Sequence, residues 1–345
     1  MSVLEEFGIS KIQKYYSRLQ QKKQVSSFQT ISELFASKHI YFVTFLAFLV
    51  GAILTFPIIW LELKYEIFNF EHINLEHIGI YVLALILLVG LEFYLLFLLG
   101  FYSIAYHLYH LHFIEEIGEH NLSEDEFLRT FSRTIMELPE PKHHNNTYNI
   151  QHHNISNRDI ILFSLLYKLK VIVSNFLLKF VARKLLTRSS FRVYTPYIAT
   201  LGTGIWDAFV LYKSIRYSQH KIVIHYVINQ LLAHHKETLS QENNLKAILA
   251  RYHYLSQYSY NFDYILTTLQ EVCPINYTQE EYLEEDVFRN CSPELLVLLF
   301  SFKAEFHTGQ ERKLIATYVD KKRLKTLRKA IKKADLSTIS SYLNI

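Results

Sequence analysis

Glycine and proline are scarce in this chain: its 345 residues include only 9 glycines and 6 prolines, against averages of about 7% and 5%. Because both residues form tight turns and interrupt helices, their scarcity favours long helices over turn-rich sheets. Cysteine is also rare, since Cys273 and Cys291 form neither a Cys-x-x-Cys pair nor a regular series. This spacing argues against a disulfide scaffold and a zinc knuckle and favours a reducing compartment. The composition predicts an all-α protein.

The sequence also lacks the short motifs of common catalytic sites. It contains no Gly-x-Ser-x-Gly elbow, no Walker A loop, no Gly-x-Gly-x-x-Gly fingerprint and no His-Glu-x-x-His zinc motif, each of which marks a particular chemistry. A signal peptide is not predicted, because nearly forty residues of mixed charge precede the first apolar run. We therefore expect no catalysis and no cofactor, and a first apolar run that stays in the protein as an anchor.

Two apolar runs, residues 40–61 and 78–101, dominate what is present. The first carries no charge and the second carries only Glu92. About 20 predominantly apolar residues are enough to span the hydrocarbon core of a bilayer as a helix. The sequence therefore predicts a two-span transmembrane helical hairpin over residues 40–104. The alternative is a hairpin buried in a soluble core.

Basic residues around these runs predict the orientation in the membrane. The loop 62–77 has only Lys64 among four glutamates, whereas residues 1–39 carry six basic residues: Lys11, Lys14, Arg18, Lys22, Lys23 and Lys38. Since Lys and Arg concentrate in short cytoplasmic flanks, both termini are expected in the cytoplasm. The prediction is a multi-pass protein of the cell inner membrane, with the lipid bilayer as a partner.

The rest of the chain divides into three helical parts. Residues 1–39 are expected to form an amphipathic arm that packs on the cytoplasmic domain or lies on the membrane surface. Residues 105–219 form a juxtamembrane region that contains an apolar hairpin, 158–219. Its recurring lysines favour burial in the cytoplasmic domain or insertion into the inner leaflet, and two further spans are the alternative. Residues 220–345 form a soluble helical domain that ends in a basic helix.

Two acidic residues interrupt the apolar helices. Glu92 lies near the middle of the second run, and Asp207 lies in the apolar stretch 193–212. A charged side chain costs about 3 kcal/mol or more at the bilayer centre, so both residues are expected to face protein or water. Glu92 is a candidate proton or cation site, or else a protonated carboxyl in a structural hydrogen bond. Gly51, Gly90 and Gly100 are expected to allow close helix approach within the spans, and Gly202 and Gly204 are expected to allow close packing within the hairpin 158–219.

Histidines and glutamates follow the second run in a dense group. His107 and His110 share one helix face, and His112 and Glu116 share another. Together with two histidines of a polar loop, His143 and His144, they are candidate metal ligands. The alternative is a set of interfacial histidines without a metal.

The C-terminal helix is both basic and amphipathic. Leu324, Leu327 and Ile331 make an apolar line between eight basic residues: Lys321, Lys322, Arg323, Lys325, Arg328, Lys329, Lys332 and Lys333. Such a helix can bind anionic lipid headgroups, and the alternative is a solvated face. Because no nucleic-acid recognition motif accompanies the charge, specific nucleic-acid binding is not expected.

The stretch FVARKLLTRSSFRVYTPYIATLGTGIWDAFVLYKSIR, residues 180–216, resembles a segment of uncharacterised bacterial inner-membrane proteins. It is also similar to the Pro…Gly…Asn helix of EcsC-type proteins, with Asp207 at the Asn position. The resemblance covers about a tenth of the chain. It implies a bacterial inner-membrane location and brings no activity with it.

These observations lead to three hypotheses about function. The first is a membrane-anchored helical protein that acts by interaction at the cytoplasmic face, as an assembly, scaffold or regulatory factor, with a protein partner or a second copy of itself. The second is an oligomeric channel or transporter subunit that uses Glu92. The third is a His-rich membrane metalloprotein.

Overall fold

The computed structural model describes residues 3–22, 28–65, 75–114, 125–136, 195–253, 260–277, 281–282, 287–302 and 309–342. Every secondary-structure element in these ranges is a helix, which confirms the all-α prediction for the described part of the chain. In chain order the helices are α1 (Val3–Gln21), α2 (Ile31–Phe35), α3 (Lys38–Lys64), α4 (Leu75–Ile114), α5 (Asp125–Ile135), α7 (Thr195–Leu239), α8 (Glu242–His253), α9 (Tyr260–Gln270), α11 (Pro293–Ser301), α12 (Gly309–Tyr318), α13 (Lys321–Lys333) and α14 (Leu336–Ser340).

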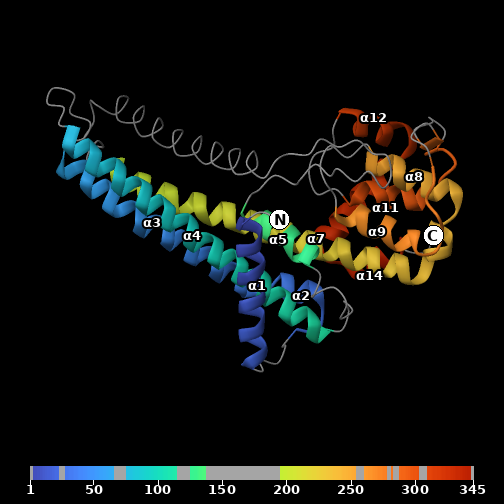
Figure 1. Cartoon of the computed structure of the whole chain (residues 1–345), viewed down its shortest axis with the longest axis horizontal. Coiled ribbons are helices and arrows are strands. Elements are labelled where there is room, and N and C mark those ends of the chain that lie inside the picture. Colours follow the sequence, from blue (N-terminus) through green and yellow to red (C-terminus); the bar gives the residue numbers. More distant parts are fainter. Residues whose placement is uncertain are drawn as a thin grey trace.

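Figure 1 shows a long rod joined to a group of short helices. In the rod, α3 and α4 lie side by side with the first half of α7. We call the end where α3 stops and α4 starts the tip, and the opposite end the base. Helices α8 to α14, the C-terminal domain, gather beyond the base, where α1 also crosses the rod beside α2 and α5. Over much of its length the rod is therefore a three-helix bundle.

Two described segments of the rod, residues 31–61 and 75–111, are long and apolar enough to cross a membrane. Only 33% of the first apolar window and 6% of the second is buried, whereas the core helix of a soluble protein is mostly buried. Large apolar side chains instead cover the outside of the rod: Phe42, Phe45, Ile53, Phe56, Leu83, Ile86, Leu87, Leu201, Ile205 and Phe209. This exposure disfavours the alternative of a hairpin inside a soluble core.

Helix α7 extends from the rod into the C-terminal domain and is kinked only near its end, at His235. The domain boundary expected between residues 219 and 220 therefore lies inside one helix. The first half of α7 packs along α3, although the sequence favoured burial in the C-terminal part or insertion into the inner leaflet. The physical reason is that Gly51 and Gly204 let the two helices approach closely. Residues 158–194, the remainder of that expected hairpin, lie outside the described residues.

Helix α1 packs through its apolar face on α4 and α5, whereas the N-terminal arm was expected on the cytoplasmic domain or on the membrane surface. Ile9 and Ile12 are buried where α1 contacts α4 and α5. The buried Glu5 carboxylate adds an ionic contact, because Arg133 Nη1 donates to Glu5 Oε1 and Arg129 Nε donates to the same oxygen at 3.1 Å. Apolar burial and this ionic contact together hold α1 against α5.

A buried ion pair joins two helices of the C-terminal domain. Arg251 of α8 and Glu311 of α12 are both fully buried, and Arg251 Nη1 lies 2.8 Å from Glu311 Oε1. The guanidinium carbon also lies 4.6 Å from the centre of the Phe300 ring. Burial lowers the pKa of Arg251 to about 10, although the charge of Glu311 acts in the opposite direction. The pair therefore depends on both partners to remain inside the core.

Replacing Glu311 with Gln is expected to destabilise the protein by about 3–5 kcal/mol, because Arg251 would keep a buried charge without its counter-charge. Thermal unfolding of the purified chain, followed by circular dichroism, measures the effect. Arg323→Gln is the matched control, since it removes an exposed ion pair with Glu294 at 2.9 Å and should cost less than about 1 kcal/mol. Equal melting temperatures for the two variants would contradict a structural role of the buried pair.

Candidate functional site

Glu92 of α4 and Asp207 of α7 meet inside the rod. The sequence indicated two separate acidic residues, and the structure buries both side chains and brings them together, so that the charge of Glu92 acts on Asp207. Within the described ranges, Asp207 Oδ2 has no hydrogen-bond partner. Since two ionised carboxylates repel one another, burial side by side favours a proton on one of them. The two residues therefore form a proton-holding pair between two apolar helices.

The contact between α3 and α7 sets the position of Asp207. Its Oδ2 atom lies against Gly51, where any larger side chain would collide with it. One turn earlier, Gly204 lies so close to α3 that an added Cβ would be 2.7 Å from the backbone oxygen of Phe48. Of the glycines at which close packing was expected, Gly51 and Gly204 lie in the contact between α3 and α7, whereas a Cβ at Gly90 or Gly202 would meet nothing within 4 Å. The contact brings Asp207 to the depth of Glu92.

His107 belongs to a buried aromatic layer at the base of the rod. Its Nδ1–H donates to the backbone oxygen of Ser103 at 2.6 Å, and its Nε2 accepts from the side-chain amide of Gln219 at 2.9 Å. Because both ring nitrogens are engaged, His107 does not present a metal ligand in this arrangement. His110 packs against the rings of Tyr106 and Phe28, at centroid distances of 4.4 and 5.4 Å. Both histidines therefore act here as packed aromatic groups.

The metal prediction receives no support from these two residues. Among the described residues, no group of three or more His, Cys, Asp or Glu side chains is placed to hold a metal ion. His112 lies in α4, but its side chain is outside the described part, as are Glu116, His143 and His144. For those four residues, metal binding stays a prediction.

A polar connection between α7 and the base of the rod was missed in the sequence. Arg216 Nη1 donates to the backbone oxygen of Phe35 at 3.1 Å and to Gln219 Oε1 at 3.0 Å. Gln219 in turn donates to His107, so these contacts hold α7 in register with α2 and α4. No local pattern marks Arg216 or Gln219, because their partners are distant in the sequence.

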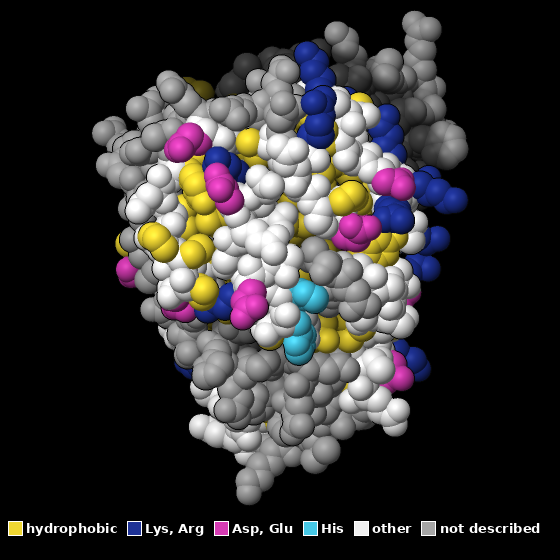
Figure 2. Space-filling model, turned by 90° about the vertical axis from the view of Figure 1, so that its right-hand side faces the viewer, with side chains coloured by type: hydrophobic (Ala, Val, Ile, Leu, Met, Phe, Trp, Pro, Cys, Tyr) yellow, Lys and Arg dark blue, Asp and Glu magenta, His cyan; other side chains and the backbone are white. Residues whose placement is uncertain are grey.

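The basic helix α13 uses its apolar line to pack on the protein. Leu324, Leu327 and Ile331 are buried, and α13 contacts α11, α14 and α7. Most of its lysines and arginines are exposed, and Figure 2, which views the end of the molecule away from the rod, shows Lys and Arg side chains gathered along one edge. Since the apolar line is used inside the protein, binding of α13 to anionic lipid would depend on charge alone.

The C-terminal end of α13 lies next to the start of the rod. Ser32 Oγ of α2 donates to the backbone oxygen of Lys333 at 3.2 Å. Burial, and secondarily the positive charges of Lys332, Arg328 and Lys221, lower the pKa of His220 in α7 to about 3. These contacts bring basic residues of α13 to the base, while the lipid contact itself stays a prediction.

No family model, no curated protein and no solved structure matches this chain. The resemblance to EcsC-type proteins therefore stays a prediction, and a candidate function rests on the geometry of the chain itself.

Gly204→Ala should separate α3 from α7, because the new Cβ would meet the backbone oxygen of Phe48. The expected cost is about 1–3 kcal/mol from overpacking. Gly202→Ala is the matched control, since a Cβ there has nothing within 4 Å, and alanine is the better helix former by about 1 kcal/mol. Thermal unfolding of both purified variants measures the difference. Equal stability of Gly204→Ala and Gly202→Ala would contradict the close packing of α3 against α7 at Gly204.

Proposed function

We propose that the chain is a membrane-anchored helical protein that presents its C-terminal domain at the cytoplasmic face of the inner membrane and acts there by interaction with another protein or a second copy. The observation that carries this proposal is α7, which joins an apolar rod to a helical domain as one continuous helix. Exposed apolar surface costs about 25 cal/mol per Å² in water. The outward-facing apolar side chains of the rod therefore favour a lipid environment.

The arrangement of the rod supports four crossings, the alternative to the two-span hairpin. α3, α4 and the first half of α7 expose apolar side chains side by side, so three crossings are assigned to them. α5 packs at the base, whereas α7 starts near the tip and runs antiparallel to α3. The end of α5 and the start of α7 therefore lie at opposite ends of the rod, as four crossings require. With an even number of crossings both termini lie on one side, in agreement with the charge distribution.

Single-cysteine labelling tests the proposed topology. In a background with Cys273 and Cys291 replaced by Ser, Leu75→Cys and Thr195→Cys should react with a membrane-impermeant maleimide added outside intact spheroplasts. Gln13→Cys and Thr238→Cys are the matched controls and should react only after permeabilisation. Labelling of Thr195→Cys only after permeabilisation would contradict four crossings. Recovery of the chain in the soluble fraction without detergent would contradict the anchor itself.

The Glu92–Asp207 pair favours a second candidate function, the movement of protons or cations across the membrane. Both carboxyl groups come from one chain and are buried between its own helices. A site of this kind does not require an oligomer to bring two acidic groups together, unlike a site built on Glu92 alone. Ionisable residues inside apolar helices commonly mark ion pathways or proton relays.

Replacement of either carboxyl tests this second candidate. If the pair moves protons, Glu92→Gln and Asp207→Asn should each abolish proton flux into liposomes that contain the purified protein, because each removes one proton-exchanging group. Glu237→Gln, an exposed site in the same helix as Asp207, should leave the flux unchanged. Flux that is unaffected by both substitutions, or absent from the unmodified protein, would reject this role.

A further inference from the structure

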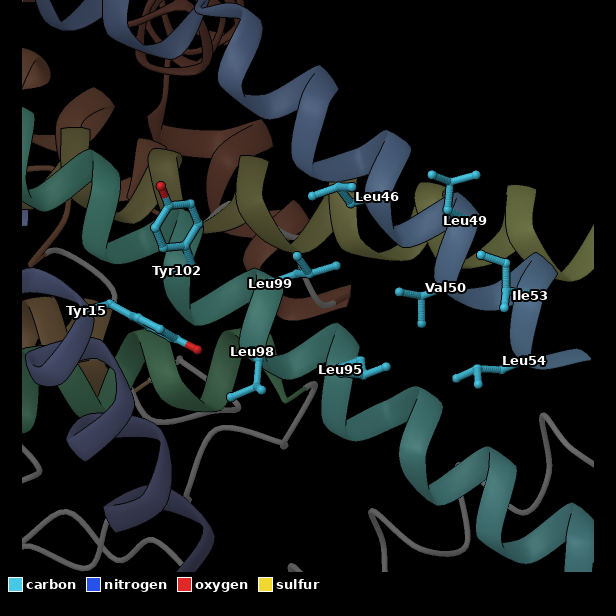
Figure 3. Close-up of a pocket in the computed structure, with 10 residues that line it drawn as sticks. All are labelled: Tyr15, Leu46, Leu49, Val50, Ile53, Leu54, Leu95, Leu98, Leu99 and Tyr102. Carbon is cyan, nitrogen blue, oxygen red and sulfur yellow. The ribbon is translucent and has the colours of Figure 1, made fainter. Parts of the chain in front are cut away.

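An apolar groove runs along the rod between α3 and α4, with a volume of about 540 Å³ (Figure 3). Leucine, isoleucine and valine side chains line its length, among them Leu46 and Val50 of α3 and Leu98 of α4. Figure 3 shows the rings of Tyr15 and Tyr102 near one another at one end, with their hydroxyl groups pointing in different directions, and Ile53 and Leu54 at the other end. The groove is therefore apolar along its length and polar at one end only.

The polar end of the groove lies at the base of the rod, beside basic residues of α1. The rings of Tyr15 and Tyr102 are 5.7 Å apart in an edge-to-face contact. On α1, Lys11 and Arg18 share a helix face with Tyr15 because they are four residues before it and three after it. Lys38 starts α3 beside His39, whose ring is 5.7 Å from that of Tyr102. The charge of Arg18 acts on the Tyr15 phenol, and Lys11 occupies the same face of α1, so positive charge of α1 lies near this end of the groove.

The depth of the groove matches one leaflet of a bilayer. At about 1.5 Å per residue, the lining residues from Leu46 to Leu54 cover about 12 Å of α3, which is slightly less than half of a hydrocarbon core about 30 Å thick. The tyrosines lie at the base, and tyrosine is enriched at membrane–water interfaces. The groove therefore extends from the expected cytoplasmic interface towards the centre of the bilayer.

We propose that this groove binds one acyl chain of an anionic phospholipid, with the lipid phosphate at the end formed by Tyr15 and Tyr102. The inference rests on the proposed membrane location. An acyl chain matches the apolar length, and a phosphate matches a phenol donor and the charges of Lys11 and Arg18. A helix of a second copy would fill the apolar length of the groove but would not supply a negative charge for the basic residues of α1. Charge complementarity therefore favours an anionic lipid.

Lipid retention by the full chain tests the proposal. The purified protein in detergent is incubated with phosphatidylglycerol or phosphatidylcholine, and bound lipid is counted by native mass spectrometry. Leu98→Trp places an indole in the groove and should lower phosphatidylglycerol binding by about tenfold, because it displaces buried methylene groups. Ile86→Trp is the matched control, since Ile86 is an exposed residue of the same helix outside the groove, and should retain the lipid.

A charge variant tests the headgroup assignment separately. Lys11→Glu combined with Arg18→Glu should remove the preference for phosphatidylglycerol over phosphatidylcholine and leave phosphatidylcholine binding unchanged. Equal lipid binding by Leu98→Trp and Ile86→Trp would overturn the groove as a lipid site. A lipid-free dimer that dissociates in Leu98→Trp would assign the groove to a second copy. A chain that needs detergent but retains no lipid contradicts only this inference, whereas a chain soluble without detergent contradicts the membrane location.

Discussion

The close contact between α3 and α7 is the constraint on which the rest of the structure depends. Because Gly51 and Gly204 have no side chains, the two helices can approach closely at these positions. Their proximity fixes the depth of α7 in the rod, and with it the position of Asp207 beside Glu92. Further along the same helix it also sets the level at which Arg216 reaches the backbone of Phe35. A single helix–helix contact therefore aligns both the carboxyl pair and the base of the rod.

Polar groups in the described rod are organised by depth. Between apolar helices, Glu92 and Asp207 lie together, and a proton on one of them reduces the cost of keeping two acidic groups away from water. At the base, histidine, glutamine and arginine side chains form a hydrogen-bonded connection between α4 and α7. The same end holds the phenol groups of the groove and the amphipathic helix α1. This order, from apolar to aromatic to charged, is the order that a membrane and its interface favour.

The C-terminal domain is joined to the rod by more than a covalent link. Its helices share a hydrophobic core with α1, α2, α4, α5 and the second half of α7, and Lys333 accepts a hydrogen bond from Ser32 just before α3 begins. Because α7 carries Asp207 in its first half and enters this core in its second, it connects one member of the carboxyl pair directly to the domain. The shared core, the hydrogen bond to Lys333 and helix α7 together fix how the C-terminal domain is oriented relative to the rod.

The sequence by itself determined the helical class, the two long apolar helices, and the unusual character of Glu92, Asp207 and the basic C-terminal helix. These features are local: they follow from composition, from the length of uncharged runs and from the 3.6-residue period. Only the tertiary structure decided that Glu92 and Asp207 form a pair, that α7 packs on α3 and enters the C-terminal domain, and that the apolar line of α13 is buried. Each of these depends on contacts between residues far apart in the chain, such as Gly51 with Asp207 or Glu5 with Arg133. Such contacts leave no periodic signal, because either partner alone is only an interruption in an otherwise ordinary helix.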